Sequence, residues 1–284
     1  MTATLIVNAD DFGMTEGHNR AIIDAHTNGI VTSTSLLANG CAFDQAVELA
    51  KEHPALGIGV HLTLTEGPPV ASNVNPLLAK DGKLPLSNQP FVRALMAGRL
   101  PREAIHREFH AQVSKVVAAG IKPTHVDGHK YIHLLPGISG IVAEIAKQFH
   151  IPVMRVPHHL ADGLSRPRRL PGAAVLIVLG KSAYRAARRA GLRSSDRVMG
   201  FVETGHLNQD TIRRLLFAPR PGVTELFCHP AYHSAQLETL LSEGYVWIAD
   251  YNFEAETTAV SDSTLRHDLE AQGWSLHSFS YLAE

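Results

Sequence analysis

The chain has 284 residues, of which 45% are hydrophobic and 19% charged, as expected for a globular protein with a sizeable core. Its formal net charge is −1, with 26 Lys and Arg against 27 Asp and Glu, which gives no support to a general nucleic-acid-binding role. Two distant cysteines, Cys41 and Cys228, exclude a disulfide scaffold and favour a reducing, cytoplasmic location. No signal peptide is expected, since the first residues lack a basic region. The chain contains 17 histidines, and histidine is the commonest metal ligand, so their positions guide the search for a site.

Strand-like and helix-like segments alternate along the chain, the pattern of an α/β protein with parallel strands. Expected strands cover 5–7, 32–37, 57–65, 124–127, 153–156, 223–228 and 276–279. Expected helices cover 16–28, 43–52, 102–119, 137–149, 209–217, 235–243 and 262–272. Residues 66–101 are rich in Gly, Pro and Asn and predict a long excursion, partly helical over 91–96, of the kind that shapes a substrate site. No linker breaks the chain, so we expect a single domain over 1–284 with long insertions.

The first polar cluster follows the apolar run 5–7 and reads Asn8-Ala9-Asp10-Asp11-Phe12-Gly13. Because consecutive side chains on an extended strand point to opposite faces, Asp10 and Asp11 are not expected to act as a facing pair. We interpret them as having different tasks, one as a metal ligand and one as a base. The alternative for an Asp in this position is a turn or a helix cap, and later histidines decide between the two.

Three further polar clusters also follow apolar runs. They are His61, within the alternating segment 57–65, the histidine-rich segment 123–133, and the pair His229-Pro230 after 223–228. In barrel enzymes the catalytic groups come from the carboxyl ends of several strands, so these clusters are expected to converge. A lone histidine is more often a structural residue, but four coincident strand exits indicate one site.

Two imidazoles and one carboxylate form a reasonable open site for zinc, with a position left for water. The same set binds magnesium or manganese more weakly, because those harder ions prefer carboxylate and water. Zinc lowers the pKa of its water toward ~7, a second Asp would accept the proton, and an opposite histidine would protonate a leaving group. This set of residues therefore predicts metal-assisted hydrolysis of an amide or ester.

Five motifs in this order resemble the YdjC-type carbohydrate deacetylases, which include chitooligosaccharide deacetylases. They lie at 8–13, 29–35, 57–65, 123–129 and 229–230, so the resemblance covers most of the chain. It implies a distorted (β/α) barrel of TIM-barrel type. It also implies a metal-dependent hydrolase that removes the N-acetyl group from an N-acetylglucosamine-containing substrate with one divalent ion, Mg²⁺ or Zn²⁺.

Position by position, the resemblance makes Asp11, His61 and His129 the metal ligands. It makes Asp10 the base that activates water and His229 the acid near the leaving amine. Arg155, at the end of the expected strand 153–156, is interpreted either as an ion-pair partner that holds Asp10 ionised or as an ordinary surface arginine.

The middle of the chain, through 200–206, resembles the branch associated with hopanoid biosynthesis, which is implied to deacetylate a glucosamine-bearing hopanoid lipid. The stretch 173–193 is apolar at first and then basic, too short for a membrane span of ~20 residues. We interpret it either as an amphipathic helix resting on the inner face of an anionic membrane or as an ordinary outer helix with solvated arginines. The expected partner is therefore an N-acetylated amino sugar or a glycolipid, with no nucleic acid; a homodimer is left open.

Two other functions are alternatives to metal-dependent deacetylation. A glycosidase needs two carboxylates facing each other across a bond, ~5–9 Å apart, which adjacent Asp10 and Asp11 do not suit. An inactive carbohydrate- or lipid-binding module on the same fold would lack a ligand or the base, and neither is missing here. A chitooligosaccharide deacetylase is the alternative to an enzyme acting on a lipid-linked sugar.

Overall fold

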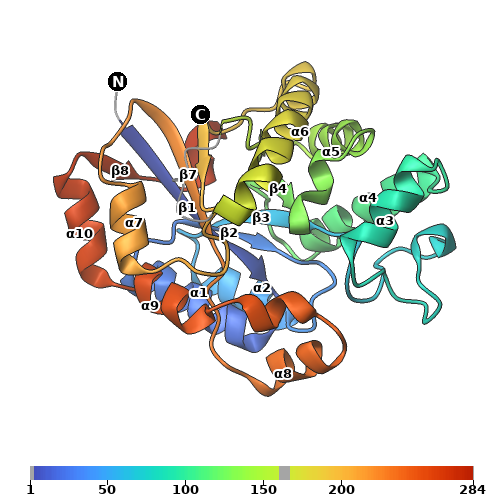
Figure 1. Ribbon diagram of the computed structural model, residues 1–284, viewed down its shortest axis with the longest axis horizontal. Coiled ribbons are helices and arrows are strands. Elements are labelled where there is room, and N and C mark those ends of the chain that lie inside the picture. Colours follow the sequence, from blue (N-terminus) through green and yellow to red (C-terminus); the bar gives the residue numbers. More distant parts are fainter. Residues whose placement is uncertain (1–2, 160–166, 284) are drawn as a thin grey trace.

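The computed structural model describes residues 3–159 and 167–283, and its centre is a parallel β-sheet with helices around it (Figure 1). The strands are β1 Ala3–Phe12, β2 Ser33–Leu36, β3 Gly57–Leu62, β4 His125–Gly128, β5 Val153–Met154, β6 Arg197–Met199, β7 Gly222–Cys228 and β8 Trp274–Leu276. The helices are α1 Glu16–Asn28, α2 Phe43–Glu52, α3 Asn88–Met96, α4 Arg102–Ala118, α5 Ile138–Gln148, α6 Leu170–Arg189, α7 Gln209–Leu215, α8 Ala235–Ser242, α9 Phe253–Val260 and α10 Ser263–Ala271.

β1 is the central strand, ten residues long and buried along its whole length. It pairs with β2 on one side and with β7 on the other, and β8 pairs with its first residues. Every named strand pair is parallel, so the strands end at one common edge. The predicted α/β architecture is confirmed, and the polar clusters that follow the strands meet at this edge.

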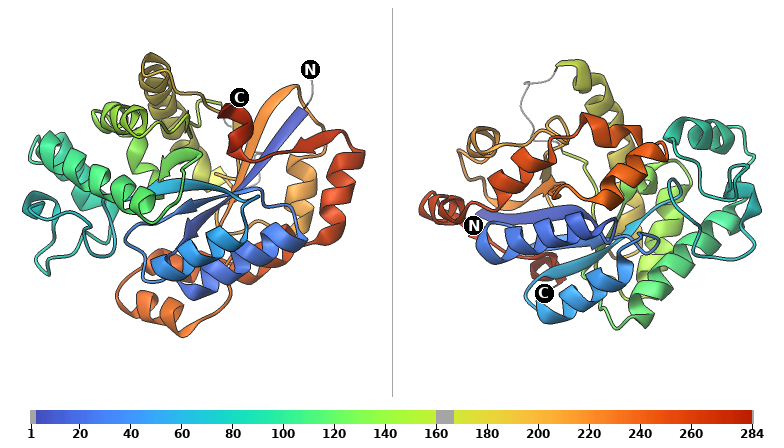
Figure 2. Two further views of the ribbon diagram at one scale, coloured as in Figure 1. Left: turned by 180° about the vertical axis from the view of Figure 1, so that it is seen from behind. Right: turned by 90° about the horizontal axis from the view of Figure 1, so that it is seen from below.

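The sheet is curled and forms part of a barrel. Its strand order is β5-β4-β3-β2-β1-β7-β6, so in the described part of the chain β5 and β6 stand at its two ends. The curvature and the helices outside it can be followed from behind and from below in Figure 2. These pairings give a half-barrel rather than the closed ring of a complete TIM barrel. The strands at both ends have only two and three residues, too few to continue the ladder.

Most expected elements form close to their predicted bounds, and two differ for local reasons. The strand expected over 57–65 ends at Leu62, because the Thr63 hydroxyl donates to the Thr65 carbonyl and closes a turn. The strand expected over 276–279 is displaced: β8 ends at Leu276, and a 3₁₀ helix begins at Phe279. Strand β6 and helix α9 had no predicted counterpart.

The apolar and basic segment 173–193 forms most of α6. This helix buries a stripe of small and apolar side chains, namely Ala173, Leu176, Gly180, Ala183 and Ala187, and packs beside α5. Among the described helices, none combines the length and apolar character needed to cross a membrane.

Two glycines allow a direct test of backbone packing. Gly29 follows α1, and a Cβ atom there would lie 1.9 Å from the carbonyl oxygen of Val260, so Gly29→Ala should lower the free energy of unfolding by ~1–3 kcal/mol. Gly140, inside α5, has open space where a Cβ atom would lie, so Gly140→Ala should raise the free energy of unfolding by ~0.5–1 kcal/mol. Urea unfolding of both variants measures the difference, and equal effects would contradict the packing seen at Gly29.

Candidate active site

Three side chains from three strand ends face one another at the carboxyl edge of the sheet. Asp11 lies near the end of β1, His61 in β3, and His129 directly after β4. Asp11 Oδ1 lies 2.9 Å from His129 Nδ1 and 3.5 Å from His61 Nε2. All three residues are buried, and one ligand atom from each lies within 4.8 Å of the others. The structure thus brings together the three residues that the sequence predicts as metal ligands.

The backbone at Asp11 explains how two consecutive Asp residues reach one cluster. Asp11 has a left-handed conformation, with φ 68°, and the pairing of β1 with β2 shifts register between Ala9 and Phe12. The alternation of the strand is interrupted there. A carboxylate oxygen of Asp10 therefore also lies within 4.8 Å of a His61 nitrogen. Asp10 and Asp11 nevertheless have different main partners, Arg155 for Asp10 and the two histidines for Asp11, which agrees with the expectation that they do not act as a facing pair.

Each imidazole of the cluster is held by a further carboxylate. His61 Nδ1 lies 2.7 Å from Asp127 Oδ1, and His129 Nε2 lies 2.9 Å from Glu66 Oε2. The opposite nitrogens, His61 Nε2 and His129 Nδ1, both face Asp11. A carboxylate that accepts one ring N–H fixes the tautomer and the orientation of the ring, an arrangement typical of histidines that bind metals.

The donor set fits one divalent cation. Asp11 is buried, and within the described residues its carboxylate faces only the ring nitrogens of His129 and His61, without a well-aligned hydrogen bond. A buried carboxylate needs a positive or donating partner, and a cation between Asp11 and the two facing imidazole nitrogens would satisfy all three groups. Two histidines and one carboxylate match an open zinc site, and the carboxylate also suits magnesium.

The pKa values of Asp11 and His129 also indicate a site that suits a cation. Burial alone would raise its pKa, but the neighbouring His129 and His61 outweigh burial and hold the pKa of Asp11 well below its usual range. Burial alone would lower the pKa of His129, yet Asp11 and Glu66 raise it to about 9. Without a cation, His129 therefore carries a proton at neutral pH, and an ion that binds at this nitrogen must displace that proton.

Arg155 follows β5 and is buried, with 1% of its surface exposed. Its Nη1 and Nη2 donate to the two carboxylate oxygens of Asp10, each at 2.8 Å, and Nη1 lies 2.7 Å from Asp127 Oδ2. Its Nε donates to Glu225. Although burial opposes the charge, Asp10 and Asp127 raise the pKa of Arg155 well above its usual value. The predicted ion pair with Asp10 is confirmed, and the surface alternative is wrong.

This arginine also distinguishes between two clusters that could hold a metal. Asp10, His61 and Asp127 form a second group of closely spaced ligand atoms. In that group the guanidinium of Arg155 already supplies the positive charge, and Asp127 already engages His61 Nδ1. The better candidate for a cation site is therefore the group of Asp11, His61 Nε2 and His129 Nδ1, where no guanidinium contact is present among the described residues.

His229 follows β7 and lies near Asp10 rather than near Asp11. Its Nε2 is 3.9 Å from Asp10 Oδ2. Its backbone N–H donates to Glu256 Oε2 at 2.7 Å, and its ring lies 5.3 Å from the ring of Tyr251. Helix α9, which provides Glu256, thus fixes the position of His229 beside the Asp10–Arg155 pair.

Several charged residues of the site had no role assigned from the sequence. Asp127 and Glu66 orient the two histidines, Glu225 binds Arg155, and Glu256 holds His229. Glu225 carried a usable signal, because a carboxylate inside the apolar strand 223–228 requires a buried partner. Glu66 carried none, because only the turn after β3 brings it back to His129.

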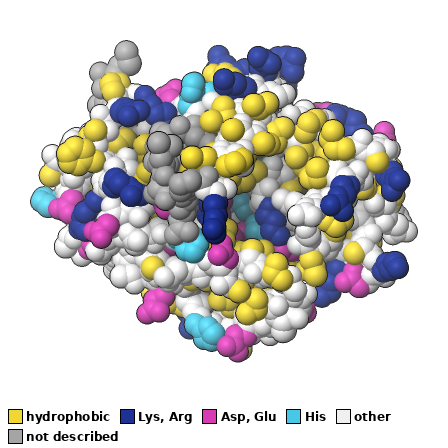
Figure 3. Space-filling model, in the orientation of Figure 1, with side chains coloured by type: hydrophobic (Ala, Val, Ile, Leu, Met, Phe, Trp, Pro, Cys, Tyr) yellow, Lys and Arg dark blue, Asp and Glu magenta, His cyan; other side chains and the backbone are white. Residues whose placement is uncertain are grey.

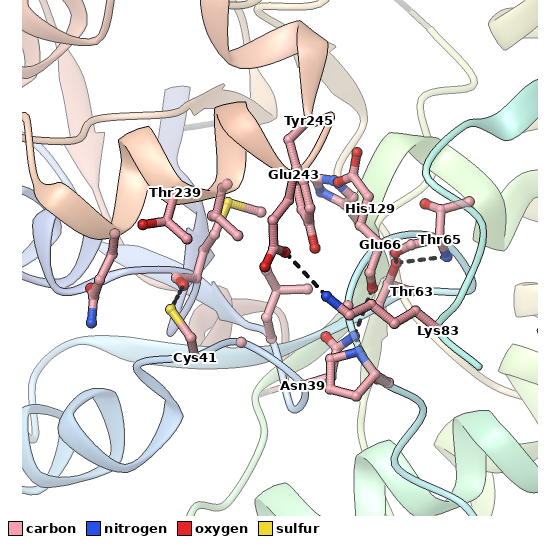
Figure 4. A pocket seen from close by; sticks show the side chains of 17 residues that line it. Asn39, Cys41, Thr63, Thr65, Glu66, Lys83, His129, Thr239, Glu243 and Tyr245 are labelled. Carbon is pink, nitrogen blue, oxygen red and sulfur yellow. Dashed lines mark hydrogen bonds and ion pairs between the residues drawn. The ribbon is translucent and has the colours of Figure 1, made fainter. Parts of the chain in front are cut away.

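A pocket of about 280 Å³ lies beside His129 (Figure 4). It is walled by the loops after β1, β2 and β3, by the excursion 66–101, and by α8. Its polar lining includes Asn39, Thr65, Glu66, Lys83, Gln236 and Glu243. Lys83 Nζ pairs with Glu243 Oε2 at 3.3 Å, which joins the excursion to the end of α8. Trp247, whose ring lies 5.7 Å from that of His129, donates from Nε1 to Glu66 Oε1 at 3.0 Å. A molecule bound in this pocket would reach the histidine–carboxylate cluster directly.

The curled parallel sheet, with its polar cluster at the carboxyl ends of the strands, defines an α/β barrel-like protein of the kind that carries its site at this edge. Residues 4–271 match the family described as YdjC-like protein. The chain therefore belongs to the YdjC-like family.

Known proteins are similar to the chain over different lengths. A chitooligosaccharide deacetylase from Yersinia enterocolitica is 32% identical over 284 residues, covering 99% of both chains. A carbohydrate deacetylase from Geobacillus stearothermophilus is 35% identical over 80% of this chain and 79% of its own. One from Brevibacillus brevis is 44% identical, but the match spans only 52% of this chain and 58% of that relative.

A solved structure shares the fold along the whole chain. It is that of a protein from Enterococcus faecalis V583 provisionally named a cellobiose-phosphate cleavage protein. The two chains superpose with a TM-score of 0.79 at 26% identity, covering 99% of each. The half-barrel is thus an arrangement already found in a crystal structure.

The cation site leads to a prediction for metal affinity. Glu66→Gln should weaken Zn²⁺ binding by ~10–100-fold, because the amide no longer fixes the ring of His129 as a carboxylate does. Asp11→Asn should weaken it further, because it removes a ligand. Calorimetric titration of metal-free protein measures both, with Glu243→Gln, an exposed carboxylate of the same pocket, as the control of unchanged affinity. Normal Zn²⁺ affinity in Asp11→Asn would contradict the site.

Proposed function

We propose that the protein is a divalent-metal-dependent hydrolase that removes the N-acetyl group from an amino sugar. The observation that carries this proposal is the cluster of Asp11, His61 and His129 with Asp10 directly beside it. The names of its relatives, carbohydrate deacetylase and chitooligosaccharide deacetylase, support the same reaction.

Asp11, His61 and His129 would hold the ion, while Asp127 and Glu66 keep the two imidazoles turned toward Asp11. When bound, such an ion polarises the acetamide carbonyl and lowers the pKa of water toward neutrality. The protein contributes the orientation of the ligands before the substrate arrives.

Asp10 is the base that accepts a proton from the attacking water. Arg155 binds both of its carboxylate oxygens, and the Asn8 side chain donates to Asp10 Oδ1 at 2.8 Å. A bidentate guanidinium fixes both the position and the plane of a carboxylate. Because Arg155 also contacts Asp127, the base and the residue that orients His61 are aligned by one cation.

His229 is the acid that protonates the departing amine. Its Nε2 lies 3.9 Å from Asp10 Oδ2, so acid and base border the same reacting group. Hydroxide from water adds to the acetyl carbon, the carbon–nitrogen bond breaks, and the nitrogen leaves with a proton from His229. The products are acetate and a free amino sugar.

The pocket beside His129 suits a sugar ring. Hydroxyl, amide and charged side chains line one part of it, and Tyr245 adds an aromatic wall. Binding sites of this kind combine a few polar groups that fix orientation with apolar surface that excludes water. We place the acetylated sugar in this pocket, with its acetamide at the cluster.

A second candidate substrate is an N-acetylated glucosamine carried on a lipid, such as the glucosaminyl hopanoid implied by the resemblance at 200–206. The observation that favours it is exposed apolar surface on residues that are neighbours, in the chain, of residues lining the pocket. Leu86 and Val246 are 40% and 76% exposed, and they lie close in sequence to the pocket residues Lys83 and Tyr245. Exposed apolar side chains next to a polar pocket suit a ligand with a sugar head and an apolar body.

A glycosidase is less well supported. Its two carboxylates must lie on opposite sides of the bond that breaks. Asp10 and Asp11 instead both lie close to one imidazole, that of His61, and Asp10 is held by Arg155. A module without activity is also disfavoured, because the proposed ligands, base and acid are all present and gathered.

Replacing the base separates chemistry from metal binding. Asp10→Asn should lower kcat by ~10²–10⁴-fold, the usual contribution of a general base, while Zn²⁺ affinity changes little because Asp10 is not a proposed ligand. Acetate release under saturating substrate and calorimetry measure the two quantities. Circular dichroism should confirm the fold, because Asp10 pairs with a buried arginine. Near-normal turnover would remove Asp10 from the mechanism.

The reaction itself is tested by the products. Zn²⁺- or Mg²⁺-loaded protein should release acetate from chitobiose or from an N-acetylglucosaminyl lipid in micelles, and the faster of the two identifies the substrate class. Shortened sugars without acetate would show glycoside cleavage instead. Absence of both products would contradict the proposed activity.

A further inference from the structure

Helix α6 exposes apolar and then basic side chains along one face. Val175 and Val178 are 60% and 68% exposed, and the basic side chains that follow in the helix are also exposed. At 100° per residue these side chains fall within an arc of about 140°, opposite the buried stripe of the helix. We call this surface the α6 outer face; it consists of Val175, Val178, Lys181, Arg185, Arg188 and Arg189.

Packing within the protein does not explain the two valines. α6 already buries a complete apolar stripe, and the outer side of such a helix is ordinarily polar. Figure 3 shows basic side chains gathered at the upper end of the molecule, where α6 lies in Figure 1, with apolar surface between them and the central hollow. The apolar surface therefore adjoins the basic one on a single face of the molecule.

The charge of this region contrasts with the rest of the chain. Residues 168–195 contain seven of the 26 Lys and Arg residues and none of the 27 Asp and Glu residues, although the whole chain has a net charge of −1. In the described part of the chain, the carboxylate contact of this stretch is that of Arg169 with Asp250, outside the α6 outer face. Among the described residues no carboxylate pairs with the basic side chains of that face, so their charge is available to an anion outside the protein.

We propose that the α6 outer face docks on the surface of a membrane that contains anionic phospholipids. Lys and Arg side chains near such a surface are attracted to the lipid phosphates, and exposed apolar side chains enter the boundary between head groups and acyl chains. The helix has 20 residues and would lie along the surface over about 30 Å. Nucleic acid would match the arginines but not the valines, so a bilayer accounts for both.

This inference goes beyond the proposed reaction and is independent of it. Docking requires only the α6 outer face, whereas acetate release requires the cluster at the carboxyl edge of the sheet. Acetate release from chitobiose, which is not attached to a membrane, reports the reaction alone.

The test is cosedimentation of the full chain with vesicles. The protein should bind vesicles of phosphatidylcholine with about 30% phosphatidylserine at low salt, bind pure phosphatidylcholine at least about tenfold less, and be released by salt. The double variant Arg188→Glu with Arg189→Glu should weaken binding to the anionic vesicles by about tenfold or more. Val175→Asn with Val178→Asn should weaken it at constant charge.

The matched control is Arg20→Glu with Lys51→Glu, the same change in net charge on α1 and α2, which lie on the other side of the molecule from α6 (Figure 1). This control should retain most of the binding, and all variants should retain acetate release from chitobiose. Three results would overturn the proposal: no binding of the wild type to anionic vesicles, equal loss in the control, or undiminished binding in both α6 variants. Binding to duplex DNA in preference to vesicles would also overturn it.

Discussion

One buried guanidinium holds the site together. Arg155 joins Asp10 of β1, Asp127 of β4 and Glu225 of β7, so strands that are distant along the sheet share a single positive charge. Removing a buried partner leaves an uncompensated charge, which costs far more than the loss of a surface ion pair. The position of the proposed base and the orientation of His61 therefore cannot change separately. With Arg155 in place, the proposed metal ion would be confined to the Asp11 side.

The backbone at the strand ends carries the second constraint. Asp11, Glu66 and Lys130 all adopt left-handed conformations, which are uncommon for residues other than glycine. Such conformations persist where the surroundings determine them, and they concentrate at functional sites. Each of these residues contributes to the contacts of His129. Asp11 faces its Nδ1, Glu66 contacts its Nε2, and Lys130 donates to Glu66. The geometry of the cluster is thus built into the turns as well as into the side chains.

The sequence was sufficient for most strands and helices, though not for β6 and α9, and for the proposed ligands that gather at the carboxyl edge. Apolar runs followed by His or Asp are local patterns and can be recognised without the structure. The sequence was not sufficient for the backbone at Asp11, because the regular period of a strand predicts neither its left-handed conformation nor the register shift of β1. Glu66 was missed because it does not directly follow an apolar run, and only the turn after β3 brings it back to His129. The half-barrel could not be foreseen, because closure depends on which strands pair at the ends rather than on any single strand.

The brevity of the terminal strands has a consequence for the behaviour of the protein at high concentration. An open sheet offers unpaired amide and carbonyl groups that can recruit a neighbouring molecule, a hazard that closed barrels avoid. β5 has two residues and β6 has three, and Val153 of β5 forms a bridge with Arg193, which covers part of that edge. Edges this short present little template for intermolecular strand addition, so the incomplete ring need not promote aggregation.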